Sequence, residues 1–114
     1  MIEVKVEKNA EIVQVVLKGE LVLNNASSVK DEVKAKLASE EEPKVLVNLA
    51  ELGFVDSSGL GVLISWFKLV NEKKGRIVFC SPGDYVAKII KIAKLDKILM
   101  LAEDEEKGKV LLLK

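Results

Sequence analysis

A continuous apolar run in the middle of the chain, followed by polar turn residues and an apolar helix, limits the possible folds more than any other feature. Residues 45–49 (VLVNL) have the composition of a parallel strand that is covered on both faces. Asp56, Ser57 and Ser58 follow it, and the next apolar pattern predicts a helix from about residue 58 to about residue 74. Loops at the carboxyl ends of parallel strands stand clear of the core, and the helix that follows offers unpaired N–H groups. We therefore expect a functional site at this junction.

Four further segments carry the apolar patterns of strands. Ile2, Val4 and Val6 alternate with charged residues, which predicts an edge strand with one wet face, paired antiparallel with the strand after it. Gly19 is predicted to end that second strand, and residues 20–24 are predicted to form a loop. The predicted strands are residues 2–6, 12–17, 45–49, 77–80 and 98–101.

The remaining segments carry helix patterns. Asn25 is a good N-cap for a first helix, which places Lys30 on its solvated face. Gly75 is predicted to close the second helix at the C′ position, and a third helix is predicted to begin with Ser81 as N-cap and Pro82 at N1. The buried face of the first predicted helix consists of Ala26, Val29, Val33 and Leu37.

The alternation of strands and helices predicts the fold class. The tail after Glu103 is either a helix that starts near Asp104 or a return strand, and the helix is favoured although Gly108 weakens it. A chain of 114 residues suffices for one domain with a real core and is too short for two of ordinary size. Strands that alternate with helices imply right-handed crossovers. The predicted fold is therefore α/β, with one domain at residues 1–114, a mostly parallel sheet of about five strands with one antiparallel edge strand, and about four flanking helices.

The composition excludes several classes of function. Lysine plus arginine and aspartate plus glutamate number 18 each, so no overall field favours nucleic acid or an anionic membrane surface. No apolar run is long enough to span a bilayer, and the amino terminus has no signal-peptide core, so we expect a soluble cytoplasmic protein. The only cysteine, Cys80, is expected to be buried and inert. The lack of histidine removes the commonest general base and the commonest zinc ligand.

The long second helix has two apolar faces. At about 100° per residue, one face forms a core stripe, in which Leu63 and Phe67 are predicted to be buried. A second strip begins beside the serines and includes Val62 and Leu69, with Trp66 on its flank. This strip is either covered by a neighbouring helix or left as a patch that faces a partner. The sequence leaves both interpretations open.

The residue types at the junction also allow two interpretations. Asp56 and the serines are ordinary N-cap residues and glycine suits a tight turn, so the segment could do no more than stop a strand and cap a helix. Two adjacent serines in front of Gly59 and Gly61, however, would have hydroxyls that no neighbouring side chain shields. On that interpretation the two glycines give a modifying enzyme close access to the serines.

Enzymatic interpretations find little support in the sequence. A serine nucleophile needs an activating base, and without histidine only a lysine such as Lys68 or Lys94 remains, neither at a motif spacing. The glycines do not complete a dinucleotide-binding loop, and the lysine of a Walker loop is missing. Asp56 with Asp84 or Glu51 could suggest a metal, yet carboxylates at such separations are usually solvated loop ends. We predict no catalytic residue, no cofactor and no metal site.

The junction and its surroundings nevertheless resemble a known family. The hexapeptide at residues 56–61, the apolar strand before it and residues 19–21 (GEL) upstream resemble the bacterial STAS-domain proteins that act as anti-sigma factor antagonists, over nearly the whole chain. The resemblance implies that the second serine of the motif, Ser58, is phosphorylated. In that family Gly-Glu-Leu is typically followed by Asp, whereas Val22 follows it here, a departure that bears on the identity of the partner or the strength of its binding. The implied partner-binding residues are Asp56, Ser57, Ser58, Gly59, Gly61, Glu20, Val22 and Val62.

The function that this resemblance implies is partner switching. In the unphosphorylated form the chain is expected to bind an ATP-binding anti-sigma factor that is also its serine kinase, and so to free the sigma factor to activate transcription. Phosphorylation of Ser58 is expected to end that binding, and a serine phosphatase to restore it. The alternative is a small-ligand or nucleotide-binding STAS-like regulatory module. A serine hydrolase is nearly excluded, and neither nucleic acid nor a membrane is expected as a partner.

Overall fold

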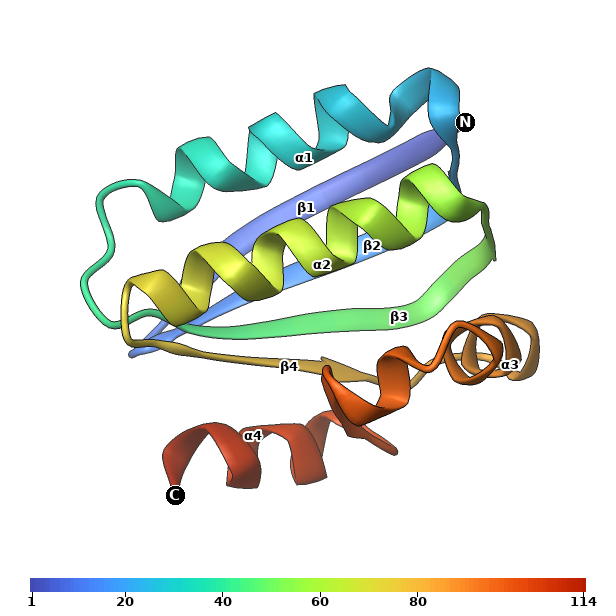
Figure 1. Cartoon of the computed structure of the whole chain (residues 1–114). Helices are drawn as coiled ribbons and strands as arrows, with labels where there is room; N and C mark the ends of the chain where they lie inside the picture. Colours follow the sequence, from blue (N-terminus) through green and yellow to red (C-terminus); the bar gives the residue numbers. More distant parts are fainter.

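The computed structural model describes residues 1–114, which form one sheet flanked by helices (Figure 1). The strands are β1 (Ile2–Asn9), β2 (Ile12–Leu21), β3 (Lys44–Val55), β4 (Arg76–Cys80) and β5 (Met100–Ala102). The helices are α1 (Leu23–Leu37), α2 (Ser57–Glu72), α3 (Asp84–Ile92) and α4 (Glu105–Leu113), with a short 3₁₀ helix, η1 (Leu95–Lys97). The strands lie side by side in chain order; β1 pairs antiparallel with β2, and the other pairs are parallel. The predicted α/β fold with an antiparallel edge strand is confirmed. No helix combines the length and the apolar character needed to cross a membrane.

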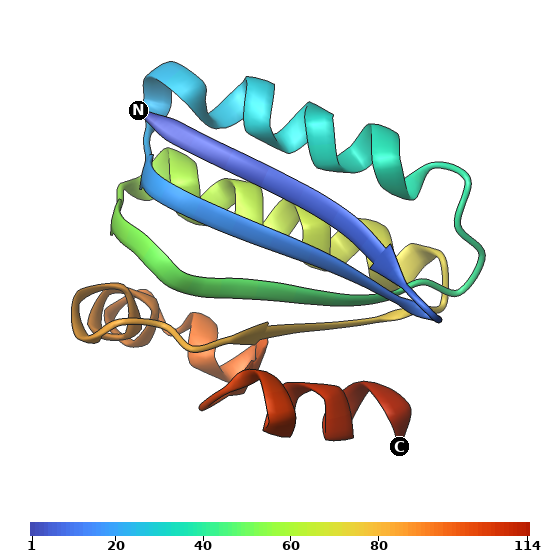
Figure 2. The same cartoon turned by 180° about the vertical axis from the view of Figure 1, so that it is seen from behind.

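Two hydrophobic clusters lie on opposite faces of the sheet, because side chains alternate along each strand. On β3, Val45 and Val47 belong to a cluster of 23 buried residues to which α1, α2 and α3 contribute. Leu46, between them, belongs to a cluster of six that includes Leu112 of α4. Figures 1 and 2 show α1 and α2 side by side on one face and α4 on the other. Since α1 and α2 each follow one of two parallel strands, both helices begin at the same edge of the sheet.

Strand β2 continues to Leu21 and does not end at Gly19, as the sequence had predicted. Gly19 has a φ of +113°, which residues with a side chain rarely adopt, and a Cβ atom there would lie 2.3 Å from the carbonyl oxygen of Met1. The register of β2 against β3 shifts between Gly19 and Glu20. The glycine therefore marks an irregularity within the strand. Only Val22 separates β2 from α1, so the predicted loop at residues 20–24 is wrong.

Helix α1 begins two residues before the predicted N-cap. Val22 occupies the N-cap position, and Asn25 lies in the first turn. The Asn25 side chain still serves the helix start, because its Oδ1 accepts a hydrogen bond from the Val22 N–H at 3.0 Å and its Nδ2 donates to the Glu20 carbonyl at 3.0 Å. The predicted buried face of this helix is confirmed at Ala26, Val29, Val33 and Leu37.

Gly75 does not close α2 as the predicted C′ residue. Lys74, with a φ of +60°, occupies the left-handed position after the helix. Glycine is required at position 75 for another reason, since a Cβ atom there would lie 2.1 Å from the carbonyl oxygen of Pro43. The sequence correctly predicts that position 75 needs glycine, but the reason is close packing against the backbone of Pro43 and not the end of the helix.

The third helix also starts later than predicted. Ser81 has a φ of +59°, outside the helical region, so Ser81 is not the N-cap and Pro82 is not the first helical residue. Gly83 is the N-cap residue and α3 begins at Asp84. The last strand begins two residues later than predicted, at Met100, because the N–H groups of Ile98 and Leu99 donate hydrogen bonds back to the Leu95 carbonyl oxygen.

The tail forms the favoured helix, α4, which begins after Asp104. The Asp104 side chain accepts a hydrogen bond from the N–H of Lys107 at 2.8 Å and so caps the helix. Gly108 is buried in this helix, and a Cβ atom there would lie 2.6 Å from a methyl carbon of Leu46, so the glycine lets α4 pack closely on the sheet. Cys80 is buried as predicted, and burial raises the pKa of its thiol.

Helix α1 covers the second apolar strip of α2. Trp66 has no exposed surface and its Nε1 donates a hydrogen bond to the carbonyl oxygen of Lys30 at 3.3 Å. Val62 is 3% exposed. The interpretation of this strip as a partner-facing patch is therefore wrong, and the interpretation as a helix contact is right. Leu63 is buried as predicted, whereas Phe67 is only half-buried.

Trp66→Ala should lower the free energy of unfolding by about 3–5 kcal/mol, because it removes the largest side chain from the α1–α2 contact and leaves a cavity. Urea denaturation followed by circular dichroism measures the loss. Leu69→Ala is the matched control on the same helix, where the side chain is only half-buried, and it should cost less. Equal losses for the two variants would contradict the burial of Trp66 beneath α1.

Candidate functional site

The turns that lead into α1 and α2 lie beside each other at one edge of the sheet. Leu21 at the end of β2 pairs with Val55 at the end of β3. The backbone N–H of Asp56 donates to the Leu21 carbonyl oxygen at 3.3 Å. The parallel strands therefore bring the first turns of the two helices together, at the strand ends where the sequence placed the site.

The carboxylate of Asp56 binds the amino ends of both helices. Its Oδ1 accepts a hydrogen bond from the Gly59 N–H at 2.9 Å, which caps α2. Its Oδ2 accepts a hydrogen bond from the N–H of Leu23, the first residue of α1, at 3.0 Å. The N–H of Gly59, and then those of Leu23 and Ser58, lower the pKa of Asp56 from its ordinary value of 3.8, against the opposing effect of desolvation. One charged side chain thus serves as a cap and as a link between the helices.

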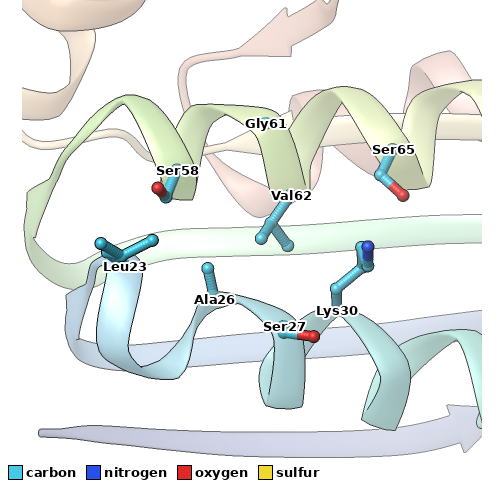
Figure 3. Close-up of a pocket in the computed structure, with 8 residues that line it drawn as sticks. All are labelled: Leu23, Ala26, Ser27, Lys30, Ser58, Gly61, Val62 and Ser65. Carbon is cyan, nitrogen blue, oxygen red and sulfur yellow. The ribbon is translucent and has the colours of Figure 1, made fainter.

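The two serines have different surroundings. Ser57 is exposed, whereas Ser58 is half-buried. Figure 3 shows the Ser58 side chain at one end of a groove between α1 and α2, on the side that faces Leu23. The predicted position of both serines at the amino end of the long helix, with Ser58 partly exposed, is confirmed.

The groove has a volume of about 380 Å³ and is formed by the first halves of the two helices. Lys30 is the only ionisable side chain that lines it, and it is half-buried there instead of lying on a fully solvated face. Leu23 is 73% exposed and forms an apolar rim. The lining residues are Leu23, Ala26, Ser27, Lys30, Ser58, Gly61, Val62 and Ser65.

Gly59 and Gly61 have different roles. Gly59 is buried, and a Cβ atom there would lie 2.3 Å from the Leu21 carbonyl oxygen and 2.4 Å from Cγ2 of Val55. It lets the first turn of α2 pack against the strand ends, so the prediction that Gly59 opens the serine to an enzyme is wrong. Gly61 is exposed and lines the groove, and a Cβ atom there would meet nothing within 4 Å.

The other residues implied as partner contacts are distributed around the same edge. Glu20 is exposed and Val22 is half-buried in the turn before α1. Val62 lies in the wall of the groove and is almost fully buried, so it does not offer the exposed contact that was expected. Sequence reasoning missed Leu23, because it started α1 too late, and it missed Lys30, because it assigned that residue to the solvated face of the helix. Their separation of seven residues, close to two helical turns, is the signal that would have placed them on one face.

The groove supplies a hydroxyl nucleophile without a neighbouring base. Lys68 lines a second depression together with Ser65, and it does not line the groove of Ser58. Lys94 lies after α3, next to η1. The Ser58 hydroxyl can therefore accept a group from an enzyme that brings its own base.

Comparison with known proteins identifies the family. Residues 3–108 match the STAS domain family. The chain belongs to that family. The STAS domain is 27% identical over 104 residues to the anti-sigma F factor antagonist of Paenibacillus polymyxa, which covers 91% of this chain and 89% of the relative.

Solved structures show the same fold. An anti-sigma factor antagonist from Mycobacterium paratuberculosis superimposes with a TM-score of 0.89 at 20% identity. The superposition covers 100% of this chain and 96% of the other. The Bacillus cell fate determinant SpoIIAA in its phosphorylated form superimposes with a TM-score of 0.71 at 22% identity, which covers 96% and 99%. At these identities the likeness establishes the architecture of the sheet and helices.

Gly59→Ala should destabilise the STAS domain by about 2–3 kcal/mol, because the added methyl group collides with the backbone of β2. Gly61→Ala should stabilise it by about 0.5–1 kcal/mol, since that position is open and alanine favours a helix. Urea denaturation of both variants measures the difference. Similar stability for the two would show that α2 does not pack on the Leu21 carbonyl.

Asp56→Asn should lower the melting temperature by roughly 5 °C near pH 7, because the amide has one acceptor oxygen for two helix N–H groups. The pKa of Asp56 is lowered in the folded state, so its contribution is present above the ordinary value of 3.8 and is lost as the pH falls through the folded pKa. Melting curves between pH 7 and pH 2 should therefore converge for parent and variant at the acidic end. A constant difference over this range would contradict the double cap.

Proposed function

We propose that this STAS domain is an anti-sigma factor antagonist that phosphorylation of Ser58 switches off. The observation that carries the proposal is the Ser58 hydroxyl, held half-exposed at the start of α2 in a groove with no base of its own. The similarity to an anti-sigma F factor antagonist over most of both chains supports it.

The unphosphorylated domain binds an ATP-binding anti-sigma factor and so frees the sigma factor to activate transcription. The partner contacts the edge formed by Glu20, Val22, Asp56 and the two serines, with Leu23 as the exposed apolar group among them. ATP and the transcription machinery place this exchange in the cytoplasm. Val22 brings an apolar side chain to the start of α1, whose first turn contains no acidic residue.

The bound anti-sigma factor is also the kinase in this proposal. The Ser58 oxygen forms a bond to the γ-phosphorus of ATP, the bond between that phosphorus and the bridging oxygen breaks, and ADP leaves. The hydroxyl proton passes to a base of the kinase, since the only ionisable side chain in the groove is a lysine. A serine phosphatase later hydrolyses the phosphoserine and restores the binding form.

Phosphorylation acts by charge and bulk at the interface, without unfolding the domain. A phosphoserine adds about −1.5 to −2 charges at pH 7, and the amino end of a helix tolerates an anion well. A dianion at a surface fitted to a hydroxyl must be desolvated without a partner, at a cost of roughly 3–4 kcal/mol, which weakens binding several-hundredfold. The solved phosphorylated form of SpoIIAA supports a phosphoryl group on a domain of this fold.

Ser58→Ala should bind the anti-sigma factor constitutively, and Ser58→Asp should bind it at least about a hundredfold more weakly. Both variants should melt within a few degrees of the parent, because Ser58 is not part of the core. Calorimetric titration with the ATP-binding anti-sigma factor of the same organism measures the affinities, and mass spectrometry after incubation with ATP locates the phosphate.

Ser57→Ala is the matched control, one residue away and exposed, and it should still be phosphorylated and still bind. The mechanism is falsified if Ser58→Asp binds as tightly as Ser58→Ala. Phosphate on Ser57, or release that occurs only through unfolding, would equally contradict the switch.

A further inference from the structure

We propose that the ammonium group of Lys30 forms an ion pair with the phosphate on Ser58. The phosphoserine side chain then lies inside the groove between α1 and α2 and not in open solvent. This inference rests on Ser58 as the modified residue, which belongs to the proposed function. It assigns a role to a side chain of α1 that sequence reasoning left on a solvated face.

Lys30 is held in place but has no ionic partner. Its backbone carbonyl accepts the hydrogen bond from Nε1 of Trp66, at 3.3 Å, so the helix segment that carries it is anchored on α2. The ion pairs of the structure are Lys8–Glu40, Lys44–Glu11 and Lys107–Glu103, and none involves Lys30. A half-buried ammonium group without a carboxylate partner is a ready site for an anion.

Ser58 and Lys30 line the same groove, with the side chain of Val62 between them (Figure 3). Figure 3 shows Ser58 at one end and the Lys30 ammonium group further along, across from Ser65. Ser58 and Ser65 lie about 10 Å apart along α2, at about 1.5 Å per residue. A lysine stem and a phosphoryl group can together cover this distance. Between them the groove is lined by Ala26, Gly61 and Val62, and on the Gly61 side nothing lies within 4 Å of the position of a Cβ atom.

The lysine side chain has to turn along α1 to make this contact. Side chains on a helix tilt toward its amino end. The amino end of α1 is the end at Leu23, which faces Ser58 in the groove (Figure 3). In Figure 3 the Lys30 stem instead extends away from Leu23 and toward Ser65, and rotation about its bonds toward the amino end of α1, the direction that helix geometry favours, brings the ammonium group closer to Ser58.

The charges around Ser58 direct a phosphoryl group into the groove. Asp56, on the loop side of the serine, is ionised, and both its oxygens are already bonded to helix N–H groups. Glu20 adds a second exposed carboxylate in the neighbouring turn. Both repel a phosphate from the loop side, whereas Lys30 attracts it from the groove side. Lys34 and Lys68 line the next depression and lie farther from Ser58.

Pairing of this kind changes what a partner meets after phosphorylation. The phosphoryl group fills part of a groove of about 380 Å³ and neutralises its only cation. A partner segment that enters the groove of the unmodified domain then finds neither the space nor the charge. Phosphorylation thus closes the groove as well as adding charge to the edge.

The test uses the full chain with phosphoserine installed at position 58 during synthesis, so that no kinase is needed. A ³¹P NMR titration measures the second ionisation of the phosphate, which lies at about pH 6 in an unpaired phosphoserine. In the folded parent we expect it roughly 1 pH unit lower, because a nearby cation favours the dianion. Lys30→Met should remove that shift and Lys30→Arg should keep it.

Lys36→Met is the matched control, a lysine on the same helix that is exposed and does not line the groove, and it should titrate like the parent. The shift should persist from 0.15 M to 1 M salt, because a direct contact is screened far less than a distant charge.

Lys30→Gln is the second variant should Lys30→Met fold poorly. If Lys30→Met and Lys36→Met titrate alike, or if the parent titrates like the urea-unfolded chain, the proposal is overturned. A Lys30-dependent shift in a domain that no kinase phosphorylates would support the contact and contradict the proposed function.

Discussion

One carboxylate, that of Asp56, links the two helices on which the site depends. A helix begins with N–H groups that have no partner within the helix, and α1 and α2 begin beside each other at one edge of the sheet. Asp56 bonds to one of these groups in each helix, at 2.9 Å and 3.0 Å. Its charge also suits the positive ends of both helices. The groove between the first turns keeps its shape because this side chain ties the two turns together.

Close backbone packing adds a second constraint at the same place. The first turn of α2 lies so near the end of β2 that no side chain fits at Gly59. Further along the helix, Trp66 is buried against α1 and bonds to the backbone of Lys30. The serine that we propose as the switch is therefore attached to a helix start that is fixed at both ends of its groove. A modification there changes the surface while the core stays in place.

This arrangement separates folding from regulation. Three residues hold the site in place. Asp56 caps α2, Gly59 packs against the end of β2, and Trp66 is buried against α1. The residues that we propose to contact a partner or a phosphate are Ser58, Leu23 and Lys30. They line the groove, and the ends of their side chains are not needed to hold the helices in place. An added phosphate can therefore move the binding equilibrium by several kcal/mol at little cost to stability. That division is what a reversible switch requires.

The sequence by itself determined the order of strands and helices, the antiparallel edge and the position of the serines, because apolar periodicity and strand-end chemistry are local signals. It also determined that Gly19, Gly75 and Gly59 are special positions. Only the tertiary structure decided why, since a clash with Met1, Pro43 or Leu21 involves residues distant in the chain. The same limit explains the misplaced start of α1, which depends on a hydrogen bond to Asp56 from 33 residues away, and the missed Lys30. A groove between two helices exists only once both are packed, so its lining cannot be read from either helix alone.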